Sequence, residues 1–172
     1  MAYTDSSFLP ASLALLTCLS EAADDISIPP LHKALRPGAA VAFDLSQGND
    51  LCCEGLAWVR QGEIFPSSDF PTVDSGATKC QPVWAVELEF GILRCAPTGT
   101  AQQTVSDEEH INTALLLSED VAALRRTLCC FAAVWAYPVA INRLSPFGPE
   151  GGCIGYLGTI TVQVIPRDTW PA

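Results

Sequence analysis

A chain of 172 residues is long enough to bury one core of ordinary size, whereas two full domains would be cramped. Hydrophobic residues make up 49% of the chain and charged residues only 16%, so we expect part of the surface to be buried against neighbouring molecules. Nineteen acidic residues against nine basic ones give a formal net charge of -10, which disfavours tight binding to nucleic acid.

The first predicted element is a helix from about Leu9 to Ala23, capped by Ser6 or Ser7. Its leucines recur at helical spacing and place Leu9, Leu13 and Leu16 on one face. Residues 1–7 contain no Lys or Arg, which a signal peptide requires, and no apolar run reaches the roughly 20 residues that span a bilayer. Export and membrane insertion are therefore not expected.

Two strands are predicted after this helix. Prolines around residues 28–38 indicate an irregular connector, and Val41–Ser46 is typical of a short strand. A long strand is predicted over Leu51–Phe65, in which Gly55 and Gly62 indicate a bulge or a close approach of another backbone segment.

A polar loop of about 17 residues, 66–82, precedes the clearest strand pattern in the chain. Apolar residues alternate with smaller or charged ones from residue 84 to residue 93, which predicts a strand with one face in the core. The residues of that core face are Trp84, Val86, Leu88, Phe90 and Ile92.

A capping box, in which Ser106 and Glu109 satisfy each other's backbone amides, predicts the start of a long helix that ends near Ala136. A short edge strand over Val139–Leu144, a loop over 145–152 and a strand over Ile154–Ile165 complete the pattern.

The element order α-β-β-β-α-β predicts an α+β fold, with a small mixed, mainly antiparallel sheet and two helices packed on one of its faces. We expect residues 1–172 to form a single domain with its core at about 41–165 and a short tail at 166–172.

Eight cysteines are many for a chain of this length, and they stand at positions 18, 52, 53, 80, 95, 129, 130 and 153. No C-x2-C spacing is present, so a zinc site is not predicted. The favoured interpretation is that most of them are small buried hydrophobic residues, although a disulfide framework would suit an exported protein. Antiparallel pairing of 51–65 with 83–94 would bring Cys53 and its neighbour Cys52 close to Cys95 and leave Cys80 far away.

No catalytic residue, cofactor or metal ligand is predicted. His32 stands in the proline-rich connector and His110 in the first turn of the capped helix, so both are expected on the surface. Nothing around any cysteine resembles a nucleophile signature. Glu87 and Glu89 share one strand face and are typical of solvated like charges. The Gly151-Gly152 pair precedes a strand and therefore does not predict a phosphate site.

Several segments together resemble virion proteins of long-tailed, siphovirus-like actinobacteriophages. They are Cys52-Cys53-Glu54-Gly55 running through Ala57-Trp58-Val59-Arg60 to Phe65-Pro66-Ser67, then Trp84 to Pro97, Asp120 to Arg126 within the capped helix, and Gly152 to Val164. The group that this chain resembles is similar to tail terminator proteins, which form a hexameric ring on the last ring of tail-tube subunits.

The resemblance implies a structural virion protein, assembled from copies of itself in the host cytoplasm, that ends tube growth and offers a docking surface to the head. It implies contacts with the tail tube protein and with a head-to-tail stopper or connector, and it implies that genomic DNA passes without specific binding. Candidate subunit or partner contacts are Arg125, Arg126, Phe147 and Glu150. The adjacent arginines also suit the end of a helix, where the dipole favours cations.

Three alternatives stay open at this point. The chain could be the head-to-tail connector or stopper rather than the terminator, although stoppers are mostly β and adaptors mostly helical. It could also be a metal-binding module or enzyme that uses its cysteines, or an exported binding domain stapled by disulfides.

Overall fold

The computed structural model describes residues 8–38, 52–76, 83–99 and 104–165. Two helices and five strands lie in the order α-β-β-β-α-β-β. The elements are α1 Phe8–Asp24, β1 His32–Leu35, β2 Leu56–Pro66, β3 Trp84–Cys95, α2 Asp107–Val134, β4 Val139–Glu150 and β5 Cys153–Val164.

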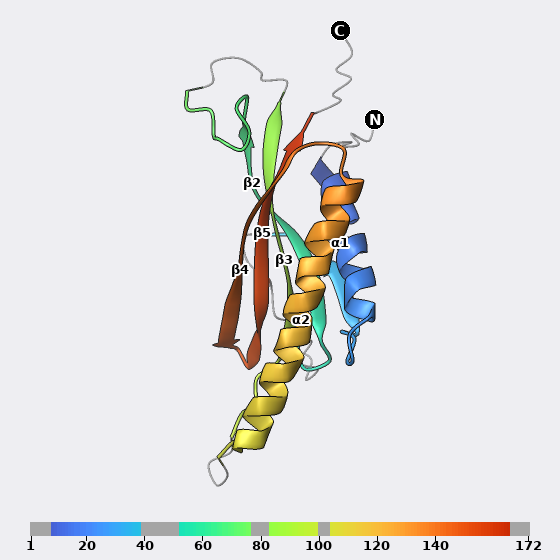
Figure 1. Ribbon diagram of the computed structural model, residues 1–172. Helices are drawn as coiled ribbons and strands as arrows, with labels where there is room; N and C mark the ends of the chain where they lie inside the picture. Colours follow the sequence, from blue (N-terminus) through green and yellow to red (C-terminus); the bar gives the residue numbers. More distant parts are fainter. Residues whose placement is uncertain (1–7, 39–51, 77–82, 100–103, 166–172) are drawn as a thin grey trace, which may run out of the picture.

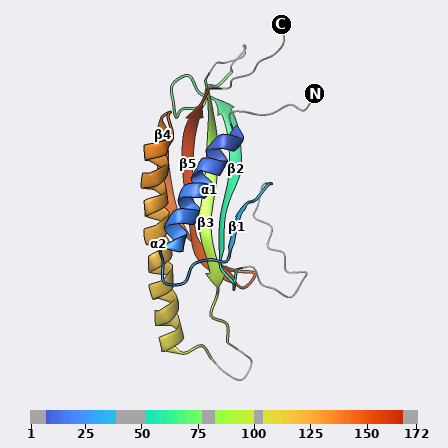
Figure 2. The ribbon, with the colours of Figure 1, turned by 90° about the vertical axis from the view of Figure 1, so that its right-hand side faces the viewer.

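The five strands form one sheet in the order β1-β2-β3-β5-β4. β1 runs parallel to β2, and the other neighbours are antiparallel. Figures 1 and 2 show both helices on the same side of this sheet, with α1 lying along α2. The predicted α+β class, the mixed sheet and the placement of the helices are confirmed.

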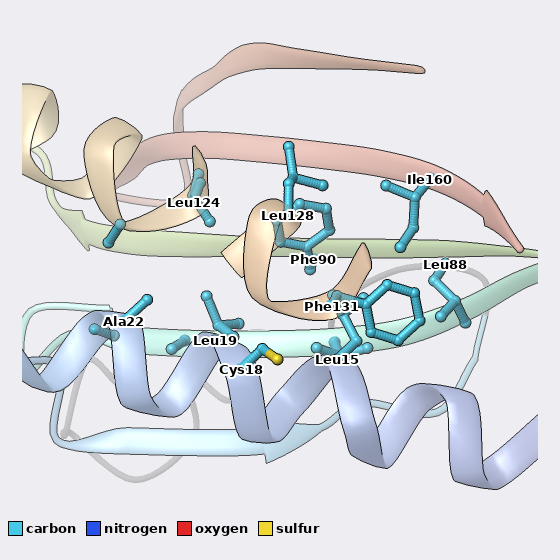
Figure 3. Packing of buried hydrophobic residues seen from close by; sticks show 14 of the residues in the cluster. Leu15, Cys18, Leu19, Ala22, Leu88, Phe90, Leu124, Leu128, Phe131 and Ile160 are labelled. Carbon is cyan, nitrogen blue, oxygen red and sulfur yellow. The ribbon is translucent and has the colours of Figure 1, made fainter. Parts of the chain in front are cut away.

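The main core lies between the two helices and the sheet. Leu15 and Leu19 from α1, and Leu124 and Phe131 from α2, meet the helix-facing side chains of the central strands (Figure 3). The strand residues include Val86, Leu88, Phe90 and Ile92, so the predicted core face of this strand is confirmed.

The predicted apolar face of the first helix is not its buried face. Leu9 and Leu13 are about half exposed, and Leu16 is only partly buried. The chain buries the opposite stripe because small residues there let α1 lie close to α2 and the sheet. The buried stripe consists of Ala11, Ser12, Leu15, Cys18, Leu19, Ala22 and Ala23.

A second, smaller core lies on the face of the sheet away from the helices. Trp58 and Leu93 are almost completely buried there, beside a disulfide between Cys52 and Cys153, and the half-buried Phe147 packs against them.

The start of β2 differs from the prediction. Residues 52–54 form a turn and β2 begins at Leu56, because Gly55 has a φ of +84° that favours glycine and interrupts an extended strand. A Cβ at Gly55 would lie 2.7 Å from the Cα of Pro30, so the predicted close backbone approach is confirmed. The predicted bulge near Gly62 is confirmed as a register shift between Gln61 and Ile64.

The connector between α1 and β2 contains a strand that was not predicted from the sequence. β1 lies between the two proline clusters and pairs in parallel with residues Leu56–Val59. The predicted strand Val41–Ser46 lies outside the described residues, as do residues 77–82 of the predicted loop.

The prediction of a short strand followed by a loop at 145–152 was wrong. β4 continues through Pro146 and Pro149 to Glu150, and the turn is confined to Gly151 and Gly152. β4 is an edge strand, where a proline removes no ladder hydrogen bond if its nitrogen faces outward.

Candidate interaction site

A groove of about 1070 Å³ runs beside the outer edge of β2. β1 covers this edge only as far as Val59, where the amide of Arg36 donates to the Val59 carbonyl. Beyond that point, Arg60–Pro66 have no neighbouring strand on the outer side among the described residues. An uncovered strand edge presents main-chain donors and acceptors to another chain.

The walls of the groove combine apolar and charged side chains. Leu9 of α1 and Ile64 of β2 are about half exposed there. Arg60 donates to Glu89 through Nε at 2.8 Å and to the Gly38 carbonyl at 3.2 Å. The Nε of Arg36 is buried and has no hydrogen-bond partner among the described residues. The groove is therefore suited to a ligand that brings both apolar contact and a hydrogen-bond acceptor.

The predicted pair of solvated glutamates lies in this groove, but the two residues differ. Glu89 is held by Arg60, whereas no ion pair is formed by Glu87 among the described residues. Gln61, on the opposite face of β2, donates to the Ser12 hydroxyl at 3.0 Å and connects β2 to α1. The β2 wall of the groove is therefore fixed by polar contacts. Acidic side chains in the lining, Glu63, Glu87 and Glu89, outnumber the basic ones, Arg36 and Arg60.

A second exposed apolar surface lies on the first half of α2. The capping box is confirmed, since Glu109 N donates to Ser106 Oγ at 3.2 Å and Ser106 N donates to Glu109 Oε2 at 2.9 Å. From this capped start the helix projects past the end of the sheet (Figures 1 and 2). Ile111 and Leu115, one helical turn apart, are 59% and 62% exposed. Apolar side chains at this spacing on a projecting helix are typical of a contact with another protein.

The four candidate contact residues have different surroundings. Arg125 is exposed and lines a shallow hollow of about 570 Å³ with Ile141 and the unpaired thiol Cys129. Arg126 lines the same hollow but donates to the Ala22 carbonyl at 2.9 Å, so it serves the last turn of α1. Within the residues that the structure describes, the hollow therefore presents Arg125 without an ion-pair partner, beside the apolar side chain of Ile141.

Phe147 and Glu150 lie at the far end of β4. Phe147 is half-buried against the smaller core, whereas Glu150 is exposed and pairs in register with Cys153. The structure therefore places neither of them beside Arg125 or in the groove along β2.

A buried ion pair that the sequence did not reveal joins β3 to α2. Arg94 donates to both carboxylate oxygens of Asp120, through Nε at 3.0 Å and Nη2 at 2.7 Å, and both side chains are buried. Burial raises the pKa of Asp120, and the neighbouring Arg94 opposes that shift. Asp120 stands on the same helical stripe as the apolar residues Leu124 and Phe131. This position was the signal in the sequence that Asp120 is buried.

Glu119, which precedes Asp120, connects α2 to the chain segment after α1. Glu119 accepts hydrogen bonds from the amide and hydroxyl of Ser27 at 2.9 and 2.6 Å, and these bonds lower its pKa. The carboxylates of Glu119 and Asp120 thus both have structural partners, and neither residue lines the groove beside β2.

Six of the seven cysteines in the described part of the chain form disulfides, so the interpretation that most of the cysteines are simply small buried hydrophobic residues was wrong. Cys18–Cys130 joins the two helices. The predicted neighbours Cys53 and Cys95 are bonded to each other, and the adjacent Cys52 is bonded to Cys153, which is the register partner of Cys95. Sequence reasoning found this proximity from strand pairing but did not predict the bonds.

The remaining chemistry-bearing residues form no constellation suited to catalysis within the described part of the chain. His32 Nε2 lies 2.6 Å from Glu54 Oε2 in an exposed pair, and His110 is exposed in the first turn of α2. No group of three or more His, Cys, Asp or Glu side chains is arranged to hold a metal ion in residues 8–38, 52–76, 83–99 and 104–165.

Neither described helix has the length and apolar character needed to cross a membrane. In comparisons with known proteins, no protein-family model and no curated protein matches this chain.

Proposed function

We propose that this protein is a structural subunit that assembles into a ring with copies of itself and caps the head-proximal end of a phage tail tube. The observation that carries the proposal is the set of exposed apolar surfaces on ordered elements, at the open edge of β2 and on the projecting turns of α2. A subunit of a ring needs such surfaces on more than one side, because each copy contacts two neighbours. The segments that resemble tail terminators lie on β2, β3, α2 and β5.

The charge of the chain agrees with this role. A net charge of -10 repels phosphates, and a conduit for DNA must let the duplex pass without holding it. The proposed partners are further copies of the chain, the tail tube protein, and a head-to-tail stopper or connector. We propose no reaction and no cofactor.

The test is the mass of the purified protein, measured by native mass spectrometry alone and after mixing with tail tubes, with electron microscopy of the tube ends. We expect a ring of six copies, in solution or on the tube, and tubes that no longer elongate. A monomer that never binds tube ends would refute the proposal. Binding of the protein to a stopper without any effect on tube elongation would favour the connector alternative.

The three disulfides favour a second candidate, an exported binding domain that is held together covalently. This candidate predicts an oxidised monomer that binds a different protein. Thiol titration of protein isolated under alkylating conditions, combined with the mass measurement, distinguishes the two candidates.

A further inference from the structure

The sheet has two open edges, and both offer main-chain groups to another strand. On the β2 side, β1 pairs only with Leu56–Val59, and Arg60–Pro66 have no paired strand on the outer side among the described residues, although Arg36–Gly38 lie across the groove from them. On the other side, β4 is the terminal strand, and nothing within the described part of the chain pairs with its outer edge.

The register of the ladder places these open edges at the same level of the sheet. Val86 of β3 pairs with Ile64 on one side and with Val162 of β5 on the other. Val162 in turn pairs with Val139 at the start of β4. A row perpendicular to the strands therefore runs from the uncovered half of β2 to the first residues of β4.

The opposite half of each edge is closed to pairing. At the level where β1 covers Val59, the corresponding residue of β4 is Leu144. Beyond Leu144, β4 contains two prolines, Pro146 and Pro149, which lack N–H donors, whereas Val139–Arg143 contain no proline. The halves that can accept a strand are thus Arg60–Pro66 and Val139–Arg143.

Each open half carries one exposed isoleucine, and the register places Arg143 of one copy at the level of Arg60 of the next, whose charge is already paired with Glu89. Ile64 and Ile141 pair with residues of the main core, so both lie on the helix side of the sheet, and they are 44% and 55% exposed. Arg143 pairs with Thr159 on the other face and forms no ion pair among the described residues. Glu87, which forms no ion pair among the described residues, and the Arg60–Glu89 pair lie on that same face.

The geometry points to an edge-to-edge interface between two copies of this chain, in which Val139–Arg143 of β4 in one copy pairs with Arg60–Pro66 of β2 in the next. This inference rests on the proposed function, because it specifies the contact that builds the ring. β4 runs opposite to β2 within the sheet, so copies that keep one strand direction pair antiparallel.

Pairing of edges at the same level explains why the assembly closes. A head-to-tail contact that adds a rise at each step produces a filament, whereas a contact without a rise produces a ring when the rotation closes. In such a ring, the sheets of successive copies join into one continuous band, and the open edge of each copy disappears.

The test is covalent trapping across the interface in mixed samples. In a background with Cys80→Ser and Cys129→Ser, protein carrying Ile64→Cys is mixed with protein carrying Val139→Cys and treated with a short bismaleimide. The matched control replaces Val139→Cys with Glu150→Cys, which lies on the same strand but at its closed end. We expect a covalent dimer in the first mixture at a yield on the order of tenfold above the control, because pairing raises the effective concentration of the two thiols.

The outcomes separate the interface from the function. Rings that form without this cross-link, or with equal cross-linking in the control, would overturn the edge pairing and leave the ring proposal standing. Cross-linking of Ile64→Cys protein with itself would indicate a two-fold dimer through β2 and would also overturn the inference. If the chain neither associates nor caps tubes, the proposed function fails first and the interface fails with it.

Discussion

Replacement of Arg94 by methionine isolates the energetic role of the buried ion pair. Methionine keeps an unbranched apolar stem, but it leaves the Asp120 carboxyl buried without its bidentate partner. Removal of one member of a buried pair typically costs about 3–5 kcal/mol, a large fraction of the roughly 5–15 kcal/mol that stabilises a domain. We expect Arg94→Met to lower the free energy of unfolding by that amount at pH 8, measured by urea unfolding without reductant.

The pH dependence gives this prediction a sign. Burial already raises the pKa of Asp120, and loss of Arg94 removes the effects that lower it. The folded variant then binds this proton more tightly than the unfolded chain, so its stability falls as pH rises from about 3.9 through the raised pKa. The slope in that window is at most about 1.4 kcal/mol per pH unit for one carboxyl. We therefore expect Arg94→Met to be less damaging at pH 5 than at pH 8.

A double variant and a surface control complete the experiment. Arg94→Met combined with Asp120→Leu buries no charge and is expected to recover most of the lost stability. Asp69→Asn, at an exposed position, is expected to change stability by less than about 0.5 kcal/mol. The reasoning is refuted if Arg94→Met behaves like the surface control, or if the double variant is no more stable than Arg94→Met alone.

Three further predictions test other parts of the fold. Paired alanine replacement of Cys18 and Cys130, which are separated by 112 residues, is expected to lower the free energy of unfolding by up to about 5 kcal/mol without reductant, and equal urea midpoints would contradict this. Ser106→Ala is expected to lower the Tm by roughly 2–4 °C. The Ser106 amide, which alanine keeps, and then the Ser106 hydroxyl, which alanine removes, lower the pKa of Glu109, so we expect only part of this difference to be lost as pH falls from ~4.3 through the lowered pKa. The part that comes from the Glu109 N to Ser106 Oγ bond should persist, which calorimetry at several pH values measures. Gly155→Ala places a Cβ 2.1 Å from a main-chain oxygen of β3 and is expected to cost at least about 1–3 kcal/mol in urea unfolding, so a neutral result would contradict the strand packing.

The elements that the sequence predicted well are those whose local signals agree with their tertiary surroundings. β3 alternates strictly and has one face in the main core, so its period of two residues is visible in the sequence. α2 begins with a capping box, which local hydrogen bonds satisfy without help from the rest of the chain.

The errors occurred where distant residues decide the structure. β1 is a strand because β2 lies beside it, and its four residues have no alternation of their own. β4 tolerates proline because its outer edge has no partner in the described residues. In α1, spacing revealed an apolar stripe, but it could not show that the buried stripe is the one with small residues.

The candidate site was only partly predictable for the same reason. Arg125 was identified from its charge, but the open edge of β2 follows from where β1 ends, which no local pattern encodes. The partners of Arg94 and of the cysteines depend on the strand order, so sequence reasoning reached Cys53 and Cys95 through a predicted pairing and missed Asp120.

Two of the disulfides and the Arg94–Asp120 ion pair lie at the end of the sheet opposite the proposed interface. Cys53–Cys95 and Cys52–Cys153 tie the chain just before β2 to the ends of β3 and β5. A slip of one residue would move every side chain of a strand to the other face and would also shift the two open edges out of level. The two disulfides fix the register at the closed end and therefore keep Ile64 and Val139 in the same row across the sheet. We expect reduction of these two disulfides to weaken assembly before it unfolds the subunit.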